Sequence, residues 1–150
     1  MWDEITAAAS AESALWAEAL RPVAEQEREP VFSRLAPAEH AIGLETIYEG
    51  YIVHFGRSRL FAPEDGDTAL LLGDYLYAHG LVHIAESGDV KAVADLAELI
   101  SHCSQLRAEG LDGDGQAWVA TSASLGTGAS PGIDEGAVAV ALAAHARLVG

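Results

Sequence analysis

The stretch "ETIYEGYIVHFGRSRLF", residues 45–61, predicts a buried helix that runs into a basic turn. Its apolar side chains recur at steps of three and four residues, which is the spacing of one buried helical face; they are Ile47, Tyr48, Tyr51, Ile52 and Phe55. His54, Arg57 and Arg59 follow, in a chain with only eight lysines and arginines. Because the C-terminal end of a helix carries partial negative charge, helix capping is the simplest interpretation of the two arginines.

The composition limits the class of protein. At 150 residues, half of them hydrophobic, the chain fits one domain with a sizeable core. A net charge of −15 argues against nucleic acid and against anionic membrane surfaces as partners. The lone Cys103 cannot form an internal disulfide, and we expect a reduced, cytoplasmic setting. We expect no membrane span, because no apolar run approaches the roughly 20 residues that one requires.

Helical periodicity continues on both sides of the opening stretch, whereas alternating strand patterns are nearly absent. Pro22 is expected to kink the first helix or to make it restart, and Asp89 is a candidate N-cap. The sequence therefore predicts one all-α domain, a bundle of about six helices, with residues 1–36 as an N-terminal helix and connector and 37–150 as the remainder. The expected helices cover residues 3–27, 37–55, 67–86, 90–109, 115–126 and 134–148.

Candidate metal ligands are few. His79, His83 and Glu86 can share one helix face, and two imidazoles with a carboxylate are a ligand set that zinc accepts. Histidines at this spacing are more often surface or core residues, so the three are weak candidates. Asp112 and Asp114 have the spacing that begins a calcium loop, but the twelfth position holds alanine instead of glutamate. No metal and no cofactor are expected.

Cys103 follows His102, but neighbouring helical residues point in directions about 100° apart and do not form a nucleophile–base pair. A packed core cysteine is the simpler reading. The segment "GTGASPG", residues 126–132, lacks the lysine of a phosphate-binding loop.

Two segments resemble the trans-isoprenyl diphosphate synthases, the all-α polyprenyl synthetase family. The segment "LLLGDYLYAHGLVHIAESGDVKAVADLAELI", residues 70–100, contains the Gly-Asp-Tyr-Leu of that family as Gly73 to Leu76. The segment "ETIYEGYIVH", residues 45–54, has the spacing of its Glu-x-x-His-x-x-x-Leu-x-His motif, with Tyr48 in place of the first histidine and His54 matching the last. The resemblance implies an isoprenoid-synthase-like bundle.

The same resemblance implies that the family's magnesium-binding Asp-Asp-x-x-Asp should begin directly after His54. Those positions read Phe55-Gly56-Arg57-Ser58-Arg59, so all three carboxylates are missing and two guanidiniums stand in their place. The lysine of the family's Lys-Thr-Ala motif is also missing, near Val119 or Ala120. Catalysis by the family mechanism on this chain alone is therefore not expected.

Three hypotheses follow. The first is a non-catalytic, prenyl-synthase-like protein that acts by association, as a homodimer or as the small or regulatory subunit of a larger polyprenyl diphosphate synthase; the candidate anchors are Trp2, Trp16 and Trp118. The second is a binding module for an isoprenoid or other apolar ligand, with a site comprising His54, Arg57, Arg59 and Asp74 and with the arginines meeting an anionic head group. The third is an enzyme of different chemistry that uses Asp74, His79 and His83.

Overall fold

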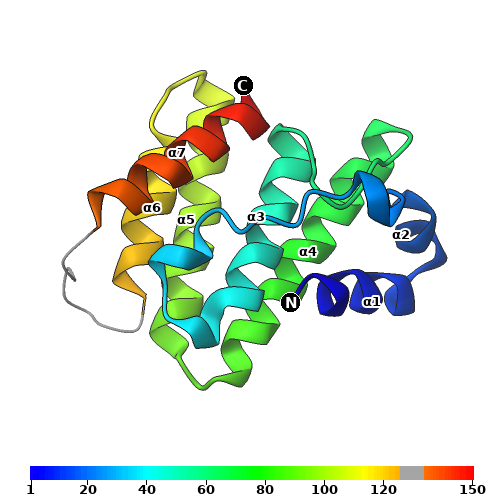
Figure 1. Ribbon diagram of the computed structural model, residues 1–150, viewed down its shortest axis with the longest axis horizontal. Coiled ribbons are helices and arrows are strands. Elements are labelled where there is room, and N and C mark those ends of the chain that lie inside the picture. The colour runs from blue at the N-terminus through cyan, green and yellow to red at the C-terminus, as the bar shows by residue number, and fades with distance from the viewer. Residues whose placement is uncertain (126–133) are drawn as a thin grey trace.

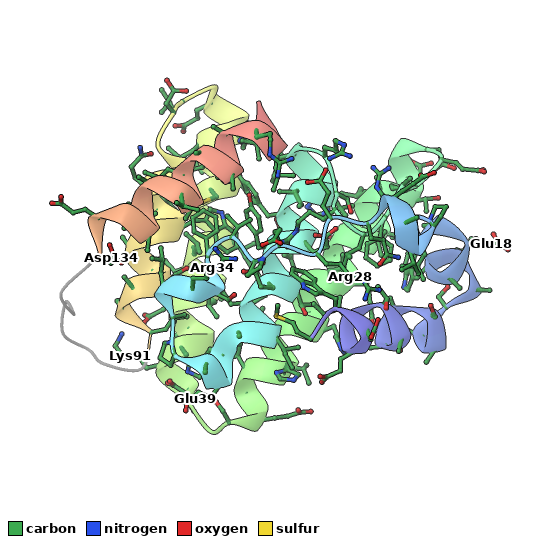
Figure 2. All side chains as sticks on the ribbon, viewed as in Figure 1. Glu18, Arg28, Arg34, Glu39, Lys91 and Asp134 are labelled. Carbon is green, nitrogen blue, oxygen red and sulfur yellow. The ribbon has the colours of Figure 1, made fainter. Side chains whose placement is uncertain are left out.

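The computed structural model describes residues 1–125 and 134–150, so the whole segment "GTGASPG" lies outside the described residues. Within the described part the regular structure is helical, which confirms the all-α prediction (Figure 1). Residues 1–125 and 134–150 form seven α-helices, where about six were expected, joined by turns and by short 3₁₀ segments at Val23–Glu25, Ser33–Leu35 and Ala38–His40. Figure 2 shows the side chains on the same ribbon. The isoprenoid-synthase-like arrangement stays a prediction. The α-helices are α1 (Trp2–Glu12), α2 (Ala14–Ala19), α3 (Ala41–Phe55), α4 (Gly66–Glu86), α5 (Val90–Glu109), α6 (Asp114–Ser124) and α7 (Glu135–Val149).

Helix α3 is the centre of the molecule. Every residue from Gly43 to Val53 is buried, so this helix is covered on all sides. In Figure 1, α1 and α2 lie on one side of α3, and α5, α6 and α7 lie on the other. The opening stretch of the sequence therefore forms the core element around which the remaining helices pack.

The α3–α4 contact depends on four glycines, two in each helix and seven residues apart: Gly43 and Gly50 in α3, and Gly73 and Gly80 in α4. A Cβ atom added at Gly80 would lie 2.8 Å from the carbonyl oxygen of Gly43, and one added at Gly50 would lie 2.9 Å from that of Gly73. Real Cβ atoms essentially never come this close to a backbone oxygen, so the two backbones are in direct contact. Glycine at these positions permits the close antiparallel crossing.

The N-terminal prediction was wrong in one respect. Instead of one helix over residues 3–27, the chain breaks at Ser13, whose backbone is extended and whose hydroxyl accepts a hydrogen bond from the amide of Leu15. Serine caps a new helix in this way because its side chain competes for backbone amides. Helix α2 ends before Pro22, so the proline begins a 3₁₀ turn and kinks no helix. Leu15 and Val23, two apolar residues of the expected helix, are 54% and 70% exposed.

The later helix boundaries agree closely with the expected ones. Asp89 is the N-cap of α5, and its carboxylate accepts a hydrogen bond of 2.9 Å from the amide of Ala92, as predicted. Pro37 precedes a 3₁₀ turn that leads directly into α3. Cys103 is buried, which confirms its reading as a core residue.

The tryptophans do not form an exposed set. Trp118 is fully buried against Phe32 and Tyr48, and Trp16 is only 8% exposed and stacks on Tyr75. The hypothesis that these two are exposed anchors for a partner is therefore wrong. Trp2 is partly buried, and its ring lies against the guanidinium of Arg59 at 4.8 Å.

Among the helices of residues 1–125 and 134–150, none is long and apolar enough to cross a membrane.

Candidate functional site

The first polar cluster is centred on Arg59, and it is an internal salt bridge. The side chain is 1% exposed and lies between two fully buried glutamates of α3. Its Nη1 donates to Glu45 Oε2 at 2.8 Å, and its Nε donates to Glu49 Oε2 at 2.9 Å. Burial alone lowers the pKa of this guanidinium, but the two carboxylates reverse the effect and raise it. Arg59 therefore stays charged inside the protein.

The remaining oxygens of these glutamates are also bonded. Glu45 Oε1 accepts from the amides of Val31 and Ser33, both at 2.9 Å. Glu49 Oε1 accepts from the hydroxyl of Ser58 and from the amide of Leu60 at 3.0 Å. Saturated hydrogen bonding is the condition under which buried charges are tolerated. The cluster joins α3 to the segments before and after it, and Arg59 is held away from the surface.

Arg57 lies at the surface and bonds to Glu27, which also accepts from Arg147 of α7 at 2.9 Å. Neither arginine of the basic turn donates to the last carbonyls of α3 within the described residues, so capping does not explain them. Their predicted contact with an anionic head group stays a prediction. In the structure, both guanidiniums bind glutamates of the same chain.

The second polar cluster is centred on Asp114 at the start of α6. Its Oδ2 accepts from the hydroxyl of Tyr51 at 2.6 Å, from Arg107 Nη2 at 2.7 Å and from His145 Nε2 at 3.0 Å. Burial by itself raises the pKa of this carboxyl, but hydrogen bonds from Tyr51 and Arg107 and the nearby positive charges lower it to about 2. Burial also lowers the pKa of His145, against the opposing effect of Asp114. One carboxylate thus joins α3, α5, α6 and α7.

The ring of His145 continues this cluster into the core. Since an ionised carboxylate only accepts, Nε2 carries the proton, and Nδ1 accepts from the hydroxyl of Tyr48 at 2.9 Å. The order hydroxyl, imidazole, carboxylate matches that of a catalytic triad. However, Tyr48 is fully buried, and burial raises the pKa of its hydroxyl further. A substrate cannot reach this oxygen, so the arrangement holds helices together.

The third polar pair joins two predicted site residues near the surface: Asp74, which is exposed, and His54, which is largely buried. His54 Nε2 lies 3.0 Å from the carbonyl oxygen of Leu70 and 3.4 Å from Asp74 Oδ1. A Cβ added at Gly73 would lie 2.1 Å from the same nitrogen, so the ring lies directly on the backbone of α4. The Gly-Asp pair of the sequence therefore has a structural role here: the glycine admits the imidazole, and the aspartate flanks it.

A hollow of about 390 Å³ adjoins this pair, between the end of α3 and the start of α4. This volume is within the range of small-molecule sites. Two other hollows of similar size, one between α5 and α6 and one beside Asp114, are lined by several charged side chains. The hollow beside His54 is the apolar one, with a single polar side chain in its lining of Val53, His54, Phe55, Gly66, Ala69 and Leu70.

The candidate metal ligands do not assemble. Among the described residues, no group of three or more histidine, cysteine, aspartate or glutamate side chains is placed to hold a metal ion. The ring of His79 stacks on Tyr75 at 5.4 Å, and Glu86 is exposed. Asp114 of the calcium-like loop binds Arg107 and His145 instead. Burial raises the pKa of the Cys103 thiol to about 12, which makes it a poor nucleophile.

Sequence reasoning missed the partners of each cluster. Glu45 and Glu49 interrupt a helix that is otherwise apolar, and two carboxylates four residues apart on a buried face are a signal of an internal cation. Arg107 and His145 gave no such signal, because they lie 56 and 97 residues from the tyrosines that they contact. Comparisons of the chain with protein-family models, with curated proteins and with solved structures found no match.

Proposed function

We propose that this chain is a non-catalytic, prenyl-synthase-like helical protein that binds a small apolar ligand, an isoprenoid or a molecule of similar shape, in the hollow beside His54. The observation that carries the proposal is the position of the apolar hollow next to the His54–Asp74 pair. Apolar walls with one or two oriented polar groups are typical of small-molecule sites. The pair also coincides with the two segments that resemble the prenyl synthases.

Two adjacent leucines provide a sharp test. Leu70 and Leu71 are both 56% exposed, but only Leu70 lines the hollow. We expect Leu70→Gln to weaken the binding of an apolar fluorescent probe at least fivefold, and Leu71→Gln to leave it within twofold. Mass spectrometry of the purified protein should also detect a retained apolar molecule. Equal effects of the two substitutions, or no probe binding, would reject the proposal.

A second candidate is association with a protein partner, a second copy or a larger prenyltransferase subunit. It is favoured by the outer face of α4, where Leu71, Ala78 and Val82 form an exposed stripe at helical spacing and the helix contains no lysine or arginine. Exposed apolar stripes of this kind mark interaction surfaces. In this candidate, Leu71 contributes to binding of the partner and Leu70 does not.

Association by this stripe predicts that Leu71→Gln and Val82→Gln reduce the complex, while Leu70→Gln has a smaller effect. Light scattering of the pure protein measures self-association, and co-purification from the native source identifies a larger subunit. A monomer that recovers no protein partner would reject this candidate.

A further inference from the structure

We infer that the hollow beside His54 selects an uncharged ligand with one hydroxyl group, and that it discriminates against the phosphorylated form of the same molecule. This inference rests on the proposed function and specifies the class of its ligand. It follows from the hydrogen bond that fixes the tautomer of His54 and from the charges that flank the hollow.

The tautomer of the neutral His54 ring is determined by its neighbour on α4. The carbonyl oxygen of Leu70 has no proton to give, so the 3.0 Å contact requires that Nε2 of the imidazole be the donor. Asp74 Oδ1, at 3.4 Å from the same nitrogen, favours the same arrangement. In the neutral ring the lone pair is therefore on Nδ1, and His54 offers a ligand a hydrogen-bond acceptor.

The orientation of that acceptor is fixed before any ligand binds. The ring packs edge-on against Tyr77 at 5.1 Å and against Phe55 at 5.8 Å, and it rests on the bare backbone at Gly73. The side chain is only 11% exposed. A fixed acceptor in an apolar wall raises the affinity for a ligand that donates one hydrogen bond, because little side-chain entropy is lost on binding.

The charged side chains that flank the hollow on the α4 side are negative, although none of them is part of its lining. Asp74 flanks the histidine, and Asp65 and Asp67 stand at the start of α4, on either side of the lining residue Gly66. The carboxylate of Asp65 already caps the amide of Thr68 at 2.7 Å. Arg57 and Arg59 do not line the hollow. A phosphate would find no guanidinium in the lining and would lie near these flanking carboxylates, so like-charge repulsion disfavours it.

Three ligands of one chain length test this inference: octan-1-ol, its methyl ether and octyl phosphate. The ether keeps the oxygen but cannot donate, and the phosphate adds the negative charge. Two-dimensional NMR titration of the full chain, read at the amides of α4 and at the imidazole nitrogens of His54, measures each affinity. We expect octan-1-ol to bind about tenfold more tightly than either analogue, the effect of one hydrogen bond in an apolar site, and to shift His54 Nδ1.

The outcomes separate the inference from the proposed function. Binding of octyl phosphate as tight as that of octan-1-ol, at the same residues, overturns the inference and leaves an apolar site. Equal binding of the alcohol and the ether overturns it as well. If none of the three perturbs the residues of the hollow, both the inference and the proposed function are overturned.

A pair of histidine variants checks the role of the acceptor. His54→Phe retains a ring of similar size but no acceptor, and we expect it to bind octan-1-ol and the ether equally. His102→Phe, on the exposed face of α5, should keep the tenfold preference. If His54→Phe does not fold, the nitrogen shift of His54 in the unaltered protein decides the question alone: a Nδ1 resonance that octan-1-ol leaves unchanged overturns the inference.

Discussion

Two ion-pair clusters connect α3 to distant parts of the chain, and they differ in the group at the centre. In one, the cation Arg59 lies between two carboxylates and is sealed from solvent. In the other, the anion Asp114 is 16% exposed and binds a guanidinium, an imidazole and a hydroxyl. In the first, every carboxylate oxygen has a hydrogen-bond partner within the protein, and the second contains groups that titrate in acid. Arg59 and Asp114 were candidates for ligand and calcium binding in the sequence, and in the structure each is bonded to side chains of the same chain.

The Arg59 cluster should lose more stability than the Asp114 cluster when its central side chain is replaced. Arg59→Met leaves Glu45 and Glu49 without their cation, and we expect the free energy of unfolding to fall by about 3–5 kcal/mol. Denaturant titration followed by circular dichroism measures the change. Arg57→Met is the matched control, since its ion pair is exposed and should contribute about 0–1 kcal/mol. Similar losses in the two variants would mean that the Arg59 cluster is no more than a surface ion pair.

The Asp114 cluster should respond to neutralisation of its centre, but less strongly. Asp114→Asn removes the charge opposite Arg107 and His145, and we expect a loss of about 2–3 kcal/mol in the same assay. Asp112→Asn changes an exposed carboxylate two residues earlier and should stay within about 0.5 kcal/mol. A loss as large as that of Arg59→Met would remove the contrast between the two clusters.

Low pH should reduce the stability that the Asp114 cluster contributes. The pKa of Asp114 is about 2 in the folded protein against an ordinary 3.8, so the unfolded chain binds more protons in that window and stability falls as pH falls through it. The expected loss is about 2 kcal/mol. His145 acts earlier and in the same direction: its pKa is lowered from 6.5, so its contribution is complete above that pH and decreases below it.

Denaturation midpoints at pH 7, 5, 3 and 2 measure this effect in the native chain and in Asp114→Asn. We expect the gap in stability between the two to narrow as the pH falls, because the variant has already lost the titrating carboxyl. A gap that stays constant down to pH 2 would contradict the assignment of the low pKa to Asp114.

A single hydroxyl gives the smallest expected effect. Tyr51→Phe removes the group that accepts from Arg107 Nε at 3.0 Å and donates to Asp114, and it should cost about 1 kcal/mol. Tyr77→Phe is its control, because the buried hydroxyl of Tyr77 has no hydrogen-bond partner among the described residues. Removing an unpaired buried hydroxyl should be neutral or stabilising. Equal losses would show that the Asp114 cluster adds nothing beyond packing.

The interior of the protein could be predicted only in part. The apolar steps of residues 45–55 correctly predicted the buried helix, because helical periodicity is a local property. The same reasoning failed at Ser13, where one side chain favours a cap over a continuous helix. Of the candidate site, the structure brings together His54 and Asp74, whereas Arg57 and Arg59 point to separate glutamates.

The sequence alone determined where most helices begin and end, since periodicity and caps such as Asp89 act over a few residues. It also determined the close α3–α4 crossing, through glycines repeated at seven-residue intervals. Only the tertiary structure decided which charges are buried and which are available to a ligand. Arg59 meets glutamates 10 and 14 residues away, and Asp114 meets Tyr51 across 63 residues. The burial that gives such pairs their strength exists only once the helices have packed.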